Sequence, residues 1–236
     1  MLWWVAAAVC AYFVKGLCGF GNTLVFTTVL AFGHDNVNIS PVDLLLGYPS
    51  NVYFAWRERK HINWRICLPL IALILLGNIP GMLFLKNADT RLIKIIFGIV
   101  TVLIGADMLL RKGGEGKQSK WMLGAIGLLS GVLCGLYGVG ALISAYISRA
   151  TKDTHAFKGN MCMVFTAENT FRLIVYACLG ILTGDVALRA LVLALPMMAA
   201  FFLGIGAGKR LDEAKAKRLV ILMLIFSGAA LVVNSL

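Results

Sequence analysis

Two oppositely charged side chains are spaced so that they can meet inside an apolar segment. Glu168 and Arg172 lie four residues apart within the apolar stretch from about Met161 to Leu182, which places both on one face of a helix. Ionisable groups buried in such a stretch cost about 3 kcal/mol or more each, so they mark candidate functional sites. In one interpretation Arg172 receives an anionic group, while Glu168 holds the guanidinium or exchanges a proton. In the other, the pair neutralises itself and only fixes the packing.

A lysine and two matching glycine clusters point to the same chemistry. Lys15 directly precedes Gly16-Leu17-Cys18-Gly19-Phe20-Gly21, and Gly135-Leu136-Tyr137-Gly138-Val139-Gly140 repeats its G-L-x-G-x-G pattern. A glycine break followed by a new helix at Asn22 or Ala141 aims free backbone N–H groups at the gap, which suits oxyanions. The rival interpretation is close helix packing, as we expect for Gly77/Gly81 and Gly204/Gly208.

A third polar group lies in a segment whose start is well marked. Ser40-Pro41-Val42-Asp43 has the residue types of a helix N-terminus, and Tyr48-Pro49-Ser50-Asn51 follows two turns later. The group from Tyr48 to Asn51 is either a proline kink repaired by its neighbours or one wall of a polar site. Lys15, Glu168 and Arg172 together sum to +1, which favours an anion. The candidate substrate-binding residues are Lys15, Gly19, Gly21, Asn22, Ser50, Asn51, Gly138, Gly140, Glu168, Asn169 and Arg172.

The composition places these residues in an all-α integral membrane protein. Of 236 residues, 60% are apolar and 14% charged, and the mean hydropathy is +0.86, beyond what a soluble core needs. Several apolar runs approach the roughly 20 residues that cross a bilayer as a helix. The clearest runs are Ile66 to Leu85, Leu92 to Leu110, Val186 to Ala207 and Leu219 to Val233.

The same composition argues against several functions. The three histidines lie apart, in loops or near helix ends, and no arrangement of nucleophile, base and orienting group is visible. We therefore expect no enzyme, no metal and no cofactor. The net charge of +11 comes from residues in short loops rather than on one polar face, so nucleic acid is not an expected partner.

Charge and length predict how the chain crosses the membrane. The stretch from Trp3 to Phe32 would reach about 45 Å as one helix, so we expect it to fold back as a re-entrant hairpin at its glycines. The stretch from Trp121 to Ser148 has the same length and break. If both fold back, 16 of the 20 Lys and Arg residues near span ends lie on one side and 4 on the other. If both cross fully, the split is 11 to 9, so the positive-inside rule favours hairpins.

This topology predicts an inverted repeat of two halves, each a glycine-broken hairpin followed by three transmembrane helices. The expected boundaries are 1–110 for the first repeat, 111–120 for a cytoplasmic linker, and 121–236 for the second repeat. The glycines of the two clusters match at a constant offset of 119. We expect a multi-pass protein of the cell (inner) membrane with both termini outside, an architecture typical of secondary transporters.

Cysteines raise an alternative of another class. Cys18 and Cys134 lie beside the two glycine clusters, which would fit a membrane thiol oxidoreductase relaying reducing equivalents between the halves. They are not at equivalent repeat positions, since Cys134 aligns with Lys15. Replacing both with serine separates this hypothesis from the others.

The chain resembles the TauE/SafE family of sulfite and organosulfonate exporters. The likeness rests on F-V-K-G-L-C-G-F-G-N near the start, its counterpart G-V-L-C-G-L-Y-G-V-G, the segment I-S-P-V-D and a charged linker. Where the family often has a further glycine after G-x-G, this sequence has Asn22 and Ala141. The resemblance implies transport of a small sulfur oxyanion or sulfonate by alternating access. A passive anion channel is the alternative, and proton or cation coupling through Glu168 and a homo-oligomer remain open.

Overall fold

Every regular element in the described part of the chain is a helix. The computed structural model describes residues 1–31, 36–87, 120–137, 140–151 and 153–208, with scattered helical residues between 91 and 109 and between 221 and 233. The elements are α1 (Leu2–Cys18), α2 (Asn22–Ala31), α3 (Asn36–Arg57), η1 (Arg59–His61), α4 (Trp64–Asn87), α6 (Lys120–Tyr137), α7 (Ala141–Ala150), α8 (Thr154–Cys178) and α9 (Gly184–Gly208). The proposed linker lies almost wholly outside the described residues.

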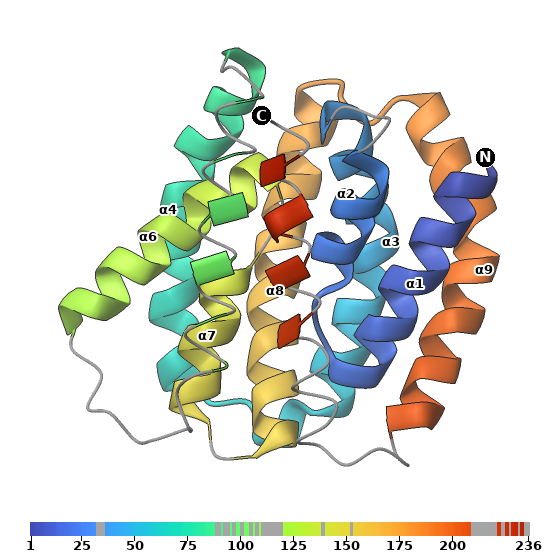
Figure 1. Ribbon diagram of the computed structural model, residues 1–236. Coiled ribbons are helices and arrows are strands. Elements are labelled where there is room, and N and C mark those ends of the chain that lie inside the picture. Colours follow the sequence, from blue (N-terminus) through green and yellow to red (C-terminus); the bar gives the residue numbers. More distant parts are fainter. Residues whose placement is uncertain are drawn as a thin grey trace.

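The first apolar stretch breaks at its glycines and folds back. Gly19 and Gly21 have φ angles of 87° and 89°, left-handed conformations that glycine adopts without the steric cost of a side chain. α1 ends before this turn and α2 begins at Asn22, as predicted. Nε1 of Trp3 donates to the carbonyl of Val29 at 2.9 Å. The start of α1 therefore lies beside the end of α2, and the two form an antiparallel hairpin (Figure 1).

The second apolar stretch breaks at the matching place. α6 ends at Tyr137 and α7 begins at Ala141, again the predicted start. Gly140 precedes α7 with a φ of −105°, whereas Gly138 lies outside the described residues. In Figure 1, α6 runs upward and α7 runs downward, while α1 runs downward and α2 upward.

Each hairpin packs against the other half of the chain. Phe13 and Leu17 of α1 lie against Gly204 and Gly208 of α9, so α1 and α9 run in the same direction. In the other half of the bundle, α6 packs on α4 in the same parallel manner, with Gly131 and Gly135 facing Gly77 and Gly81. Each hairpin therefore packs on a helix from the opposite half of the chain.

The central pair, α3 and α8, runs antiparallel. The hydroxyl groups of Tyr48 and Thr170 lie 3.1 Å apart, and those of Ser40 and Tyr176 lie 3.3 Å apart. α3 begins at Asn36, so the prediction that this helix starts at Ser40 is wrong. Ile39 and Val42 are fully buried, and this packing carries the helix past Pro41 despite its missing N–H.

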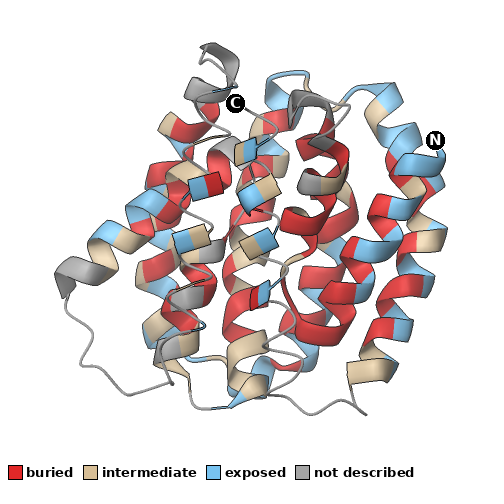
Figure 2. Ribbon diagram, viewed as in Figure 1, coloured by how far each residue is buried: buried red, intermediate tan, exposed pale blue. Residues whose placement is uncertain are grey.

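The outer surface of the bundle is strongly apolar. Figure 2 shows buried residues facing inward and exposed ones on the outside of the helices, and on α9 Leu191, Leu195 and Leu203 are each about 70% exposed or more. An extended apolar surface of this kind is typical of contact with lipid. Within the described residues, two helices have the length and hydropathy of membrane spans, α4 over Trp64–Met82 and α9 over Gly184–Gly208.

Glycines at the helix contacts have the packing role predicted for them. A Cβ atom on Gly204 would collide with the backbone carbonyl of Phe13 and lie 3.1 Å from the Cα of Gly16. Gly77 and Gly81 meet the α6 backbone in the same way. Small residues let helices approach this closely inside a membrane.

Replacing Gly204 with alanine should lower the stability of the protein by about 1–3 kcal/mol, because two backbones must separate to admit the methyl group. Thermal unfolding in detergent measures this as a fall of several degrees in melting temperature. Gly206→Ala is the matched control on the same helix, since no atom of another described helix lies within 4 Å of its Cβ position. Equal melting temperatures for the two variants would contradict the packing role of Gly204.

Candidate substrate site

A small cavity lies where the first hairpin turns, between that turn, α3 and α8. Its volume is about 30 Å³, above the roughly 10–15 Å³ that one water molecule needs. Charged groups, amides and backbone share its wall with aromatic and aliphatic side chains. The lining residues are Lys15, Gly19, Phe20, Gly21, Asn22, Thr23, Leu24, Asp43, Leu44, Gly47, Asn51, Gly140, Met161, Phe165, Asn169 and Arg172.

Lys15 reaches the cavity from the last turn of α1. The lysine is 2% exposed, and Nζ donates to Oδ1 of Asn51 at 2.6 Å and to Oδ1 of Asn22 at 3.1 Å. The negative end of the α1 dipole favours a cation at this place. Among the described residues these contacts use two of the three ammonium donors, so one donor can serve a ligand.

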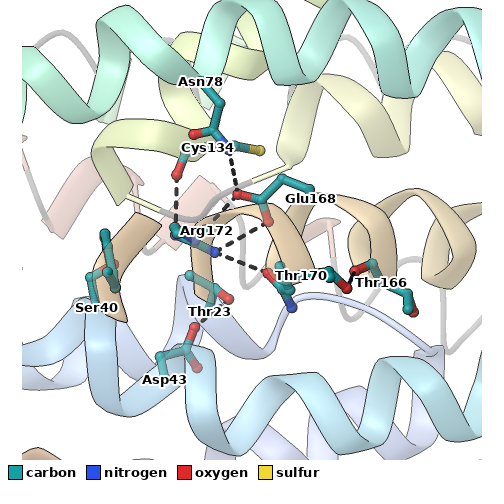
Figure 3. Close-up of polar contacts among 11 residues, drawn as sticks. Thr23, Ser40, Asp43, Asn78, Cys134, Thr166, Glu168, Thr170 and Arg172 are labelled. Atoms are coloured by element: carbon teal, nitrogen blue, oxygen red, sulfur yellow. Dashed lines mark hydrogen bonds and ion pairs between the residues drawn. The ribbon is translucent and has the colours of Figure 1, made fainter. Parts of the chain in front are cut away.

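Arg172 reaches the cavity from α8 and is held by several partners. It forms the predicted pair with Glu168, with Nε 3.2 Å from Oε1 and the terminal nitrogen Nη2 3.3 Å from Oε2. Nη2 also donates to Oδ1 of Asn169 at 3.1 Å, and Nη1 donates to the carbonyl of Cys134 at 3.1 Å (Figure 3). Behind the pair, Nδ2 of Asn78 donates to Oε1 of Glu168 at 3.0 Å.

The two cations occupy related places in the two halves. Cys134 is the counterpart of Lys15 at the offset of 119, in the last turns of α6. In the second half, Arg172 donates to the backbone carbonyl of Cys134. At the matching position in the first half, the cation is the side chain of Lys15 itself. Each glycine break therefore has one buried cation beside the helix that leads into it.

Asp43 is a site residue that sequence reasoning missed. It is 4% exposed, and its carboxylate accepts from Thr23 Oγ1 at 2.5 Å, from Tyr12 OH at 3.2 Å and from Asn22 Nδ2 at 3.2 Å. A usable signal was present, because Asp43, Gly47 and Asn51 recur every four residues and so share one face of α3. All three line the cavity.

The presence of Asp43 changes the net charge that the sequence predicted for the site. The sum of +1 from Lys15, Glu168 and Arg172 omitted this carboxylate. With ordinary charges, two cations and two carboxylates sum to zero. Net positive charge therefore does not distinguish an anion site here, and what matters is which charged groups face the cavity.

The structure brings most of the predicted site residues together. The predicted residues that line the cavity are Lys15, Gly19, Gly21, Asn22, Asn51, Gly140, Asn169 and Arg172. Glu168 is buried but lies outside this lining, where it pairs with Arg172. Ser50 donates from Oγ to the carbonyl of Gly47 at 2.7 Å, a contact within α3, and it is not among the lining residues. Gly138 lies outside the described residues.

The model of the family described as "Sulfite exporter TauE/SafE" matches residues 4–231, which is nearly the whole chain. The chain belongs to the TauE/SafE family. No curated protein and no solved structure gave a match. TauE/SafE membership implies membrane transport of a sulfur-containing anion, and it agrees with the family resemblance found in the sequence.

The backbone of the first turn offers donors that fit a TauE/SafE substrate. Val25 N–H donates to the Gly21 carbonyl at 3.2 Å, the first bond of α2. The N–H groups of Asn22, Thr23 and Leu24 precede it, and a helix leaves such groups without an acceptor of its own. All three residues line the cavity. A helix N-terminus in this position favours oxyanion oxygens.

Gly19→Ala should reduce transport at least tenfold, because the turn must shift at the cavity wall. A left-handed φ strains any residue with a Cβ, and that Cβ would lie 2.7 Å from Cγ of Lys158. Uptake into proteoliposomes measures the loss. Gly180→Ala is the control, since Gly180 has a φ of 68° and no atom lies within 4 Å of its Cβ position. Equal transport losses in both variants would mean that backbone strain alone, not the cavity, is responsible.

Proposed function

We propose that this protein is a secondary transporter that exports a small sulfur-containing anion, such as sulfite or a small organosulfonate, by alternating access. The observation that carries the proposal is that Lys15 and Arg172, one from each half, line a single buried cavity beside the N-terminus of α2. Both cations and the free N–H groups donate to anionic oxygens. Glu168, the partner of Arg172, is set back from the cavity.

The substrate-binding set that we propose is the one named from the sequence without Ser50, and with Asp43 and Thr23 added. Lys15 and Arg172 contact the anion, and Asn51 and Asn169 hold the two cations in place. The glycines of the turn let the anion approach the backbone, because no Cβ intervenes. Glu168 positions Arg172 from behind. The small cavity favours compact anions over bulky sulfonates.

The membrane arrangement that we propose is the inverted repeat with re-entrant hairpins. Related helices run in opposite directions in Figure 1, as α1 and α6, α3 and α8, and α4 and α9 each do. Both hairpins would then enter from opposite sides and meet near the middle of the bilayer. With the 16 to 4 distribution of basic residues, both termini lie outside.

Export of an anion requires no nucleotide in this arrangement. A cytoplasm-negative potential contributes about 2.3 kcal/mol per exported negative charge per 100 mV. The sequence contains no G-x-x-x-x-G-K-[ST] segment of the kind that cradles nucleotide phosphates. The substrate gradient and the potential are therefore sufficient driving forces.

Counterflow in proteoliposomes tests this function and its alternatives. Vesicles loaded with unlabelled sulfite should accumulate labelled sulfite from outside above its equilibrium level. A passive channel gives flux without such accumulation. The double variant Cys18→Ser/Cys134→Ser should keep counterflow, since neither cysteine is among the described lining residues. Loss of counterflow in a correctly folded double variant would support the thiol relay instead.

A further inference from the structure

Asp43 carries the only carboxylate among the described lining residues of the cavity. Its three side-chain partners, Tyr12, Asn22 and Thr23, are all neutral donors. Lys15 and Arg172 interact with this carboxylate only through longer-range electrostatic attraction, without a hydrogen bond or ion pair between these described side chains. Asp43 therefore stands in the cavity without a directly bonded counter-ion in the described structure.

A single amide connects Asp43 to the cation nearest the first turn. Oδ1 of Asn22 accepts from Nζ of Lys15 at 3.1 Å, while Nδ2 of Asn22 donates to Oδ1 of Asp43 at 3.2 Å. An anion drawn to Lys15 thus enters close to a fixed negative charge. Like charges in a buried site repel strongly, because little water screens them.

Charge balance shows how this repulsion can be relieved. The group of Lys15, Asp43, Glu168 and Arg172 sums to zero with an empty cavity, so a bound monoanion leaves −1 in a buried place. A proton on Asp43 restores neutrality. Anion binding and proton binding at Asp43 must then favour each other, since linkage between two sites is reciprocal.

The hydrogen bonds around Asp43 accept either protonation state. The Thr23 hydroxyl donates to Oδ2 of Asp43 at 2.5 Å, and a hydroxyl can reverse its role and accept a hydrogen bond from that oxygen once the carboxyl is protonated. Glu168, which the sequence offered as the proton carrier, is less suited. Its oxygens face Arg172 and the amide of Asn78, and protonation would remove the counter-ion of a buried guanidinium.

The helices packed around Asp43 differ in the charged and titratable groups that they contribute. α2 contributes none, and α9 has Asp185, which is exposed, and Arg189, which stacks on Trp4 at 5.4 Å. The groups nearest to Asp43 are Tyr12 and Lys15 from α1, and Glu168, Arg172 and Tyr176 from α8. Of these carboxylates, Asp43 is the one that lines the cavity.

We propose that Asp43 is a proton-binding site that takes up one proton when an anion enters the cavity and releases it when the anion leaves. The proton passes from water to a carboxylate oxygen, and no other bond changes. The inference rests on the proposed function. It means that a monoanion moves without net charge and a dianion moves with one negative charge, so the membrane potential assists only the dianion.

Methanesulfonate is a suitable probe because it stays a monoanion over the working pH range. In wild-type proteoliposomes with a pH-sensitive dye inside, outward methanesulfonate flux should carry one proton per anion and should not respond to a clamped voltage. Apparent affinity should fall about tenfold per pH unit on the alkaline side, as expected for uptake of one proton. Asp43→Asn should bind the anion more tightly, with no pH dependence, and its flux should become voltage-sensitive.

Asp185→Asn, an exposed carboxylate change outside the cavity, is the control and should behave as wild type. Wild-type flux without proton movement, or flux that needs Na⁺ instead, would overturn the proton site even if Asp43→Asn fails to fold. Absence of any anion counterflow in wild type would instead overturn the proposed transport function. The two failures are therefore distinguishable.

Discussion

Arg172→Gln is expected to reduce anion flux by on the order of 100-fold, the loss of about 3 kcal/mol of interaction with a buried charge. Arg172 lines the cavity and contacts both α8 and the end of α6, so the variant loses the cation that one half contributes. Counterflow of labelled sulfite measures the effect. Unchanged flux would remove Arg172 from the site.

The single variant also leaves Glu168 buried without its partner, which destabilises proteins by about 3–5 kcal/mol. A double variant, Arg172→Gln/Glu168→Gln, separates the two effects. It should recover most of the melting temperature, because both charges are gone, while transport stays lost. Recovery of transport together with stability would mean that the pair only fixes the packing, the interpretation that the sequence left open.

The breaks in the two apolar stretches were predictable because their signals are local. A stretch of some 30 apolar residues exceeds one span, and glycine is the residue that a break requires. The helix starts at Asn22 and Ala141 follow directly from where the clusters end. The contact between Glu168 and Arg172 was equally predictable from the sequence, because residues four apart on one helix lie at a fixed distance from each other.

The role of Asp43 was harder to predict because it depends on packing between distant segments. Its acidic type and its place after Ser40 and Pro41 have the pattern of a helix N-terminus, and that local interpretation accounted for it. The helix instead begins at Asn36, since burial of neighbouring side chains outweighs the local signal for a helix start at Ser40. The spacing of Asp43, Gly47 and Asn51 gives them one face of α3, but the approach of Tyr12 and Thr23 from other helices is what places Asp43 in the cavity wall.

The two halves contribute unequal chemistry to one site. The first supplies Lys15, Asn22, Asp43 and Asn51, whereas the second supplies Asn169 and Arg172. In the inverted repeat that we propose, the halves can exchange conformations while the ligand contacts stay specific to each. This asymmetry makes the lysine at the first turn the most discriminating residue to test.

Lys15→Met is expected to lower anion flux about as strongly as the loss of Arg172, by on the order of 100-fold. Methionine keeps much of the side-chain volume but removes the charge and the donors to Asn22 and Asn51. Counterflow measures transport, and a thermal unfolding curve checks that the variant folds. A fall in flux without a matching fall in stability is the expected pattern.

Lys158→Met provides the matched control, because Lys158 contacts the same turn from outside the cavity. Its side chain packs against Gly19, and its Nζ lies 3.5 Å from the Leu17 carbonyl and 6.0 Å from the Phe54 ring centre. Removing this charge leaves the described cavity wall intact, so flux should stay within about twofold of wild type. If the two lysine variants lose flux equally, general positive charge near the turn, and not an ammonium facing the cavity, accounts for anion binding.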